Sequence, residues 1–144
     1  MTERTGRCLC GAVTFRLSGE PISSRICWCR DCQHVSANGT VNAVFRADAF
    51  QVQGPLTEYA KRADSGNTIA RLFCAVCGGH VYGHTSARPH LRVIRVGALD
   101  VPSSIAPQQN IWTSSAPAWA CLDAGIEQVS EQPAPPPAPK GTLA

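Results

Sequence analysis

The chain has 144 residues, a formal net charge of +3, and an ordinary hydrophobic content of 44%. That length supports one domain with a modest core, and no apolar run is long enough to cross a membrane. The opening residues, MTERTGRC, carry no apolar signal segment, so we expect the protein in the cytoplasm, where thiols stay reduced. Eight cysteines in that compartment favour metal binding or catalysis over disulfides.

Short segments with a two-residue period predict strands along most of the chain. In GAVTFRLS, the apolar residues Val13, Phe15 and Leu17 alternate with polar ones, as in a half-buried strand. The segments predicted as strands are residues 11–18, two short strands within 41–54, a hairpin over 56–74 with its turn at 64–67, and residues 90–99.

Helical signals are almost absent. Only DCQHVSAN, residues 31–38, suggests one helical turn, placed after Cys32, and no segment sustains a 3.6-residue period. The sequence therefore predicts a small, all-β, antiparallel fold of short strands held together by metal.

The composition changes near residue 130. Five of the eleven prolines lie within residues 133–139, in the stretch SEQPAPPPAPKGTLA. Such a segment cannot bury a core. We therefore predict a zinc-binding domain over residues 1–128 and a disordered Pro/Ala-rich tail over residues 129–144.

Two cysteine pairs have the spacing of a structural zinc site. Cys74 and Cys77, in FCAVCGGH, form a C-x-x-C motif whose following glycines allow a tight turn beneath an ion. Cys8 and Cys10, in RCLCG, can supply two more sulfurs because positions i and i+2 of an extended segment face the same way. The alternative of two local disulfides is less favourable, because C-x-C bridges are strained and the cytoplasm is reducing.

A second cysteine group has three members. Cys27, Cys29 and Cys32 lie within ICWCRDCQ. Structural zinc takes four ligands, whereas catalytic zinc typically keeps three protein ligands and one open position. The three cysteines therefore predict an open zinc site, unless Cys121 or His34 supplies a fourth ligand and makes the site structural.

The positive charge does not indicate a nucleic-acid partner. Seven zinc-bound thiolates with two Zn²⁺ ions would contribute a charge of about −3, which cancels the formal charge of the chain. No block of Lys and Arg is interleaved with aromatic residues, as a single-strand binding groove would need. We expect neither a nucleic acid nor a membrane as a partner, and the sequence leaves the oligomeric state open.

Four motifs, GRCLCGAVTFRLSG, CWCRDCQ, LFCAVCGGHVY and NIWTSSAPAW, follow one another along the chain. In order and spacing they resemble the glutathione-dependent formaldehyde-activating enzyme family, which also includes centromere protein V. The resemblance covers about residues 6–128. It implies a β-tent fold, in which small antiparallel sheets splay around a structural zinc. It also implies a carbon–sulfur lyase activity that joins formaldehyde to glutathione as S-hydroxymethylglutathione and reverses the reaction.

The resemblance implies two zinc ions per chain. The chain has Trp28 where the family usually has His, and Gln33 where a basic residue is common. By matching motif, Cys8, Cys10, Cys74 and Cys77 correspond to the structural zinc ligands, and Cys27, Cys29 and Cys32 to the catalytic ones.

Residues around the three cysteines are further candidates. Trp28 either lines the substrate pocket or packs into the core, and Asp31 either orients a ligand and accepts a proton or caps a turn. Arg30 and Gln33 have the chemistry to meet a carboxylate of a peptide-like thiol. We predict that Trp112 and Trp119 line the core or a pocket.

These features predict a cytoplasmic, zinc-dependent carbon–sulfur lyase. Its substrate would be a small thiol adduct of the S-hydroxymethylglutathione kind, with a thiol such as glutathione as its partner. The alternative is a non-catalytic, zinc-stabilised binding module, which a closed second site would favour.

Overall fold

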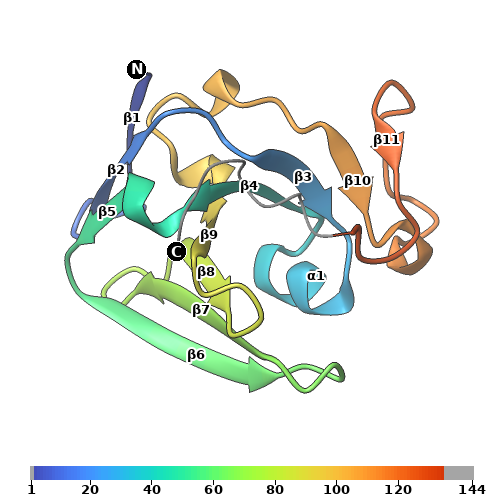
Figure 1. The fold of residues 1–144 in the computed structure, drawn as a ribbon, viewed down its shortest axis with the longest axis horizontal. Coiled ribbons are helices and arrows are strands. Elements are labelled where there is room, and N and C mark those ends of the chain that lie inside the picture. The colour runs from blue at the N-terminus through green and yellow to red at the C-terminus, as the bar shows by residue number, and fades with distance from the viewer. Residues whose placement is uncertain (1, 135–144) are drawn as a thin grey trace, which may run out of the picture.

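The computed structural model describes residues 2–134, which form mainly short strands (Figure 1). The helical elements are α1 Arg30–Ser36 and four 3₁₀ turns, η1 Ala47–Ala49, η2 Val96–Ala98, η3 Pro102–Ser104 and η4 Thr113–Ser115. The strands are β1 Glu3–Arg7, β2 Thr14–Ser18, β3 Ser23–Cys27, β4 Thr40–Arg46, β5 Phe50–Gln53, β6 Leu56–Arg62, β7 Thr68–Cys74, β8 His80–Thr85, β9 Leu91–Arg95, β10 Gln109–Ile111 and β11 Glu127–Gln128.

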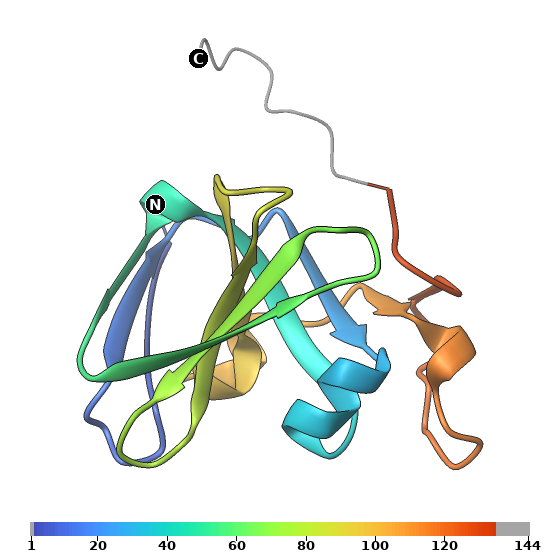
Figure 2. The ribbon, with the colours of Figure 1, turned by 90° about the horizontal axis from the view of Figure 1, so that it is seen from below.

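The strands form two sheets. One has the order β1-β2-β5, and the other has the order β11-β10-β3-β4-β9-β8-β7-β6. In Figures 1 and 2, the β6–β7 hairpin splays away from β3 and β4, and α1 lies in the opening between them. The prediction of an all-β, tent-like fold is confirmed. No helix within residues 2–134 has the length and apolar character needed to span a membrane.

Strand direction departs from the prediction at one place. β10 runs parallel to both β3 and β11, so the larger sheet is mixed and not wholly antiparallel. The long connection after β9, which contains η2 and η3, lets the chain return to the edge of β3 in the same direction. A strand of three residues is too short for its period to be read from the sequence.

The individual elements follow the predicted segments closely. The segment 41–54 forms β4 and β5 with η1 between them, and 56–74 forms the β6–β7 hairpin. The strand predicted over 90–99 ends at Arg95, where η2 takes over. The helix is longer than predicted and begins before Cys32, because the Cys29 sulfur accepts a hydrogen bond from the Cys32 amide and caps its first turn.

The main core lies between the two sheets. Phe15 of β2 packs in one cluster with Phe45 of β4 and Ile94 of β9, and each is at most 2% exposed. Phe50 joins the sheets by edge contacts, with ring centroids 5.6 Å from Phe15 and 4.8 Å from Tyr82. The alternating apolar side chains of the segment predicted as a strand over residues 11–18 are all buried, as its alternation requires: Val13, Phe15 and Leu17.

The opposite face of the larger sheet carries a row of polar residues across its middle strands. Arg25 of β3 lies opposite Asn42 of β4, and Asn42 lies opposite Arg95 of β9. Residues paired directly across strands project to the same side. Ala43 and Ile94, their chain neighbours, project to the core side instead. The face that carries Arg25, Asn42 and Arg95 is therefore the face away from the main core.

The chain stays hydrogen-bonded beyond β11. The Val129 amide donates to the Asn110 carbonyl at 2.8 Å, and the Trp112 indole donates to the Gln132 side chain at 3.1 Å. The predicted domain boundary after residue 128 therefore falls within a bonded segment. The rest of the predicted tail, residues 135–144, lies outside the described residues.

We expect truncation after Glu127 to lower the free energy of unfolding by about 2–4 kcal/mol, since it removes several backbone hydrogen bonds worth about 1 kcal/mol each. It also removes Val129, which packs against the apolar residues around the second cysteine group. Urea unfolding of the truncated and full-length chains measures the difference. Truncation after Ala134 is the control, and an equal effect of both truncations would contradict the proposed role of this segment.

Candidate metal centres

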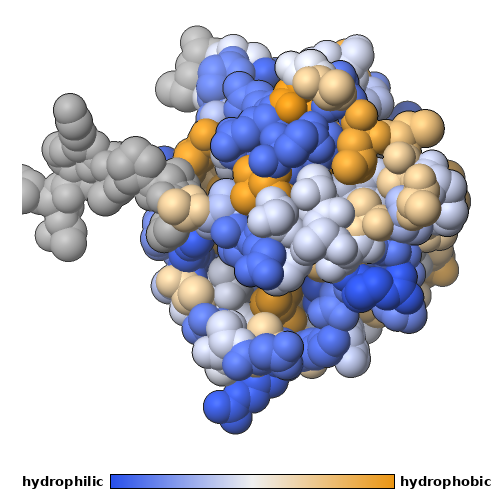
Figure 3. Space-filling model, turned by 90° about the vertical axis from the view of Figure 1, so that its right-hand side faces the viewer, coloured by the Kyte–Doolittle hydropathy of each residue, from blue (hydrophilic) through white to orange (hydrophobic). Residues whose placement is uncertain are grey.

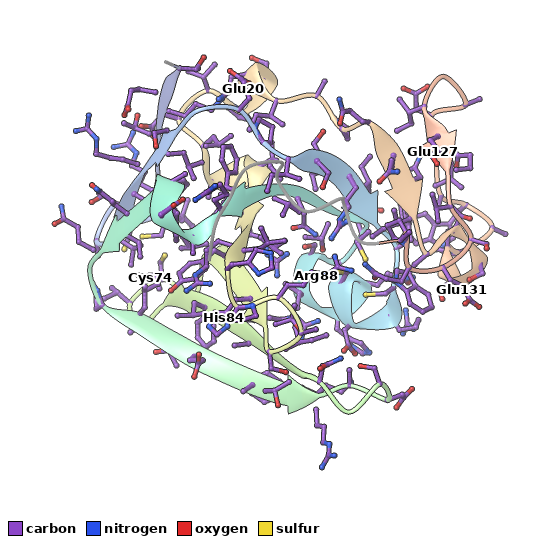
Figure 4. The ribbon with its side chains drawn as sticks, viewed as in Figure 1. Glu20, Cys74, His84, Arg88, Glu127 and Glu131 are labelled. Atoms are coloured by element: carbon purple, nitrogen blue, oxygen red, sulfur yellow. The ribbon has the colours of Figure 1, made fainter. Side chains whose placement is uncertain are left out.

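The cysteines that the sequence groups together also come together in space. Figure 4 shows sulfur atoms in two separate places, one beside Cys74 and one beside α1. Within residues 2–134, two groups of side chains have the spacing of a metal site, and both consist of cysteines alone. They are Cys8, Cys10, Cys74 and Cys77, named here the four-cysteine cluster, and Cys27, Cys29 and Cys32, the three-cysteine cluster.

The four-cysteine cluster has the dimensions of a tetrahedral metal site. The Cys10 sulfur lies 3.6 Å from that of Cys8 and 3.8 Å from that of Cys74, and all four sulfurs lie within 4.8 Å of one another. A disulfide needs a separation of about 2.05 Å. A tetrahedron with zinc–sulfur bonds of about 2.3 Å has edges of about 3.8 Å. The sulfurs therefore fit one metal ion and not two disulfides.

Two turns bring these four sulfurs together. The first connects β1 and β2, where Gly11 adopts φ +82° and its amide donates to the Cys8 carbonyl. The C-x-C motif was predicted to be extended, but it lies in a turn, because the chain reverses there. The second turn connects β7 and β8, with Gly78 at φ +75°. A Cβ atom at Gly79 would lie 3.3 Å from the Leu9 amide nitrogen, so the two turns approach closely.

Backbone amides donate to these sulfurs. The Val13 amide lies 3.3 Å from the Cys8 sulfur, and the Val76 amide lies 3.3 Å from the Cys74 sulfur. Burial raises the pKa of the Cys8 thiol, but the hydrogen bond from Val13 and those from the other thiols outweigh it and lower the pKa to about 6. Such hydrogen bonds favour the thiolate, which is the form that binds metal.

The three-cysteine cluster forms where β3 meets α1. Cys27 is the last residue of β3, Cys29 caps α1, and Cys32 lies in its first turn. Cys27 and Cys32 are buried and Cys29 is half-buried. The Thr40 hydroxyl donates to the Cys32 carbonyl at 3.0 Å, which fixes the helix against β4. Because all three cysteines lie within six residues, local structure alone brings the sulfurs together.

Neither candidate for a fourth ligand joins this cluster. His34 is exposed on α1, and Cys121 is exposed in the loop before β11. No other His, Cys, Asp or Glu of residues 2–134 lies with the three sulfurs. The described part of the chain therefore offers three thiol ligands and leaves a fourth position free of protein ligands.

The three thiols are electrostatically unequal. Hydrogen bonds from the thiols of Cys27 and Cys32 lower the pKa of Cys29, and the positive charge of Arg71 lowers it further. Hydrogen bonding to Cys29 and Cys32, together with burial, raises the pKa of Cys27. Close thiols cannot all ionise without a cation, so metal binding at this cluster must release protons.

Trp28 packs into the protein and does not line the cluster. Its side chain is 4% exposed, and its indole donates to the Asn110 side chain at 3.2 Å. A Cβ atom at Gly39 would lie 2.8 Å from the Trp28 ring, so this glycine provides the space for the indole. Gln33 has a similar supporting role, because its amide donates to the carbonyls of Trp28 and Ser115 at 2.7 and 2.9 Å.

Asp31 contacts cations and not the sulfurs. Its carboxylate lies 2.8 Å from the ammonium of Lys61 and 3.6 Å from the guanidinium of Arg71. It joins α1 to the β6–β7 hairpin and positions the Arg71 charge near Cys29. Arg30 bonds to the Gln33 side-chain oxygen at 2.6 Å on the exposed side of α1.

The two C-terminal tryptophans differ from each other. Trp112 packs partly buried against the three-cysteine cluster, as predicted, and adopts the left-handed conformation at φ 57°. Trp119 is 68% exposed, so the prediction that it lines the core or a pocket is wrong. Figure 3, which views the side of the molecule that carries β10 and β11, shows mostly hydrophilic residues with separate apolar spots.

Three arginines near the three-cysteine cluster were not predicted from the sequence. Arg71 and Arg95 are only 7% and 9% exposed, and Arg25 is half-buried. Burial lowers the pKa of the Arg95 guanidinium, and the thiols of Cys32, Cys27 and Cys29 oppose this shift where they are ionised. A signal was present in the sequence for Arg71, which interrupts the apolar strand TIARLFC, where an unpaired charge is costly.

Comparisons with known proteins give one family and one related fold. A family model described as glutathione-dependent formaldehyde-activating enzyme matches residues 3–115, which include both cysteine clusters. A crystal structure of a Rhodobacter sphaeroides protein is similar, with a TM-score of 0.56 and 23% sequence identity over 72% of this chain and 91% of that chain. At that identity, the likeness shows a shared fold alone. No curated protein matches the chain.

Proposed function

The chain belongs to the glutathione-dependent formaldehyde-activating enzyme family, and we propose that it is a zinc-dependent carbon–sulfur lyase acting on the adduct of a small thiol such as glutathione. The observation that carries this proposal is the difference between the two clusters, one with four sulfurs and one with three, within residues 2–134. Structural zinc is closed by four ligands, whereas catalytic zinc keeps a position for water or substrate.

The two clusters would hold two zinc ions with different tasks. The four-cysteine cluster joins the β1–β2 turn to the β7–β8 turn, far apart in sequence, as a stabilising site does. The three-cysteine cluster would hold the second ion. Zinc bound there supplies a Lewis acid that keeps a coordinated thiol in its thiolate form at neutral pH.

The proposed reaction balances without a redox cofactor. In one direction the thiolate sulfur attacks the carbonyl carbon of an aldehyde, a carbon–sulfur bond forms, and the carbonyl oxygen takes a proton from water. In the other direction the hydroxyl group loses that proton, the carbonyl re-forms, and the carbon–sulfur bond breaks to release the thiolate. Arg71 and Arg95 provide positive charge around the sulfurs, which favours the anionic forms of the reactants.

We expect the zinc-loaded protein to accelerate the interconversion of glutathione and S-hydroxymethylglutathione at least tenfold. Magnetisation exchange between the two species, followed by NMR with ¹³C-labelled formaldehyde, measures the rate. The Cys121→Ser variant should be as active as the original chain, because Cys121 lies outside both clusters. A protein that carries two zinc ions, yet neither binds thiols nor changes the exchange rate, would refute the proposal.

A further inference from the structure

We propose that Arg25, Arg71 and Arg95 form an anion site beside the three-cysteine cluster, and that this site binds a carboxylate carried by the substrate thiol. The inference rests on the proposed function, which supplies a thiol as the substrate. It names the residues that would select a thiol with a carboxylate over a neutral thiol of the same size.

Strand pairing places two of these arginines on the same face as the cluster. Arg25 and Cys27 are two residues apart in β3, so their side chains project to one side of the sheet. The pairing from Arg25 through Asn42 to Arg95 continues that side across β4 to β9. Arg95 and the first sulfur ligand therefore share the face of the larger sheet that lies away from the main core.

The third arginine reaches the same face from β7. Arg71 lies opposite Gly83 of β8, and Gly83 lies opposite Val93 of β9, two residues before Arg95. A Cβ atom at Gly83 would lie 3.8 Å from a terminal nitrogen of Arg95, so the Arg95 guanidinium extends over β8 towards Arg71. The absence of a side chain at Gly83 leaves the space that this guanidinium uses.

These arginines retain unused hydrogen-bond donors. The Nε atoms of Arg25, Arg71 and Arg95 are buried without a hydrogen-bond partner in the described residues. Arg95 donates to the Asn42 side chain, which is uncharged. Buried guanidinium donors without acceptors reduce stability, so a site that retains three of them is suited to an incoming acceptor.

The charges around the three-cysteine cluster have a positive sum, which favours an anionic ligand. The three arginines and Lys61 face the carboxylate of Asp31 and the single net negative charge of a zinc ion held by three thiolates. About two positive charges then remain unbalanced. A substrate thiolate supplies one negative charge and a carboxylate supplies the second. Arg88, which Figure 4 shows between β8 and α1, adds to the positive side because its charge acts on Arg25.

A carboxylate suits this arrangement better than a neutral polar group. Planar guanidinium groups pair with the two oxygens of a carboxylate in parallel, charge-assisted hydrogen bonds. A carboxylate close to the sulfur can also bind the zinc ion itself, because carboxylate oxygens are zinc ligands. A preference for acidic thiols therefore reports the arginines only where it falls in arginine variants that keep both zinc ions.

The test compares binding of matched thiols to the zinc-loaded full chain by titration calorimetry. The acidic probes are mercaptoacetate, 3-mercaptopropionate and 4-mercaptobutyrate, which place the carboxylate at three distances from the sulfur. The neutral probe is 2-mercaptoethanol. We expect at least one acidic thiol to bind ten times more tightly than 2-mercaptoethanol. Equal binding of acidic and neutral thiols overturns the anion site but leaves the thiol site intact, whereas failure of every thiol to bind overturns the proposed function as well.

Arginine variants test whether the preference for acidic thiols comes from the proposed anion site. Arg71→Gln and Arg95→Gln should each reduce it to about threefold or less, while zinc content by elemental analysis stays at two ions per chain. Arg16→Gln is the matched control, because Arg16 is an exposed arginine of the other sheet. Should either glutamine variant fail to fold, Arg95→Lys, which keeps the charge but not the planar fork, should lower the preference partially. A preference that survives all three substitutions also overturns the proposal.

Discussion

Replacing Cys74 by serine is expected to remove one zinc ion and to lower the melting temperature by about 10 °C or more, as a loss of several kcal/mol implies for a domain of this size. Cys74 is 1% exposed and its sulfur belongs to the four-cysteine cluster. The cluster joins Cys10 to Cys74 across 64 residues. An ion that closes so long a loop restricts the unfolded chain strongly.

Substitution at Cys74 also disturbs packing, so a second variant separates the two effects. Cys10 belongs to the same cluster but is exposed, and Cys10→Ser therefore removes a sulfur ligand with little change in the core. Differential scanning calorimetry and elemental analysis of both variants give melting temperature and zinc content together. Cys121→Ser is the control and should match the original chain. If Cys10→Ser kept both zinc ions and its melting temperature, the shared ion of this cluster would be excluded.

The sequence predicted the sulfur groupings because spacing alone restricts them. Cys27, Cys29 and Cys32 are so close along the chain that almost any turn brings their sulfurs together, and the structure does so at the start of α1. The pairing of Cys8 and Cys10 with Cys74 and Cys77 is non-local, and it could be anticipated only because each pair lacked two ligands. The alternation in β2 likewise predicted its buried side before the partner sheet was known.

The arrangement around the three sulfurs could not be predicted in the same way. Arg25, Arg71 and Arg95 come from three strands, and only the strand order and register place them on one face. The apolar neighbours of Arg71 in β7 mark this arginine as unusual, but they do not say which side chains it meets. For Trp28, adjacent to two of the cysteines, the sequence left pocket lining and core packing both open. Its indole bonds to Asn110, whose position opposite Ile26 depends on the parallel strand β10.

The difference between the two clusters has a thermodynamic consequence. The four-cysteine cluster closes a loop of 64 residues, whereas the three-cysteine cluster spans residues that one strand end and one short helix already hold. By loop-closure entropy alone, the first should contribute about 2 kcal/mol more to stability than the second. Stability should therefore depend on the four-cysteine cluster, and chemistry on the three-cysteine cluster.

Replacing Cys29 by serine is expected to remove one zinc ion, abolish thiol binding and the exchange reaction, and change the melting temperature by only a few degrees. Two thiolates are too few to retain the ion against competing chelators. The fold should survive, because the Cys29 sulfur caps α1 by accepting from the Cys32 amide, and a serine hydroxyl is a stronger cap at that position. The variant thus changes the metal site while keeping the hydrogen bond that starts the helix.

The matched variants are His34→Ala and Cys121→Ala, which remove the two side chains that would close the site. Both should keep two zinc ions and full thiol binding, since neither side chain lies with the three sulfurs in the described structure. Zinc content by elemental analysis, thiol affinity by calorimetry and melting temperature are measured on the same samples. Loss of an ion from either alanine variant would show a closed, four-ligand second site. That result would favour a zinc-stabilised binding module over the lyase. Retention of both ions by Cys29→Ser would instead show that this cysteine is no ligand. Only loss from Cys29→Ser with retention in both alanine variants is consistent with an open metal site built from three cysteines.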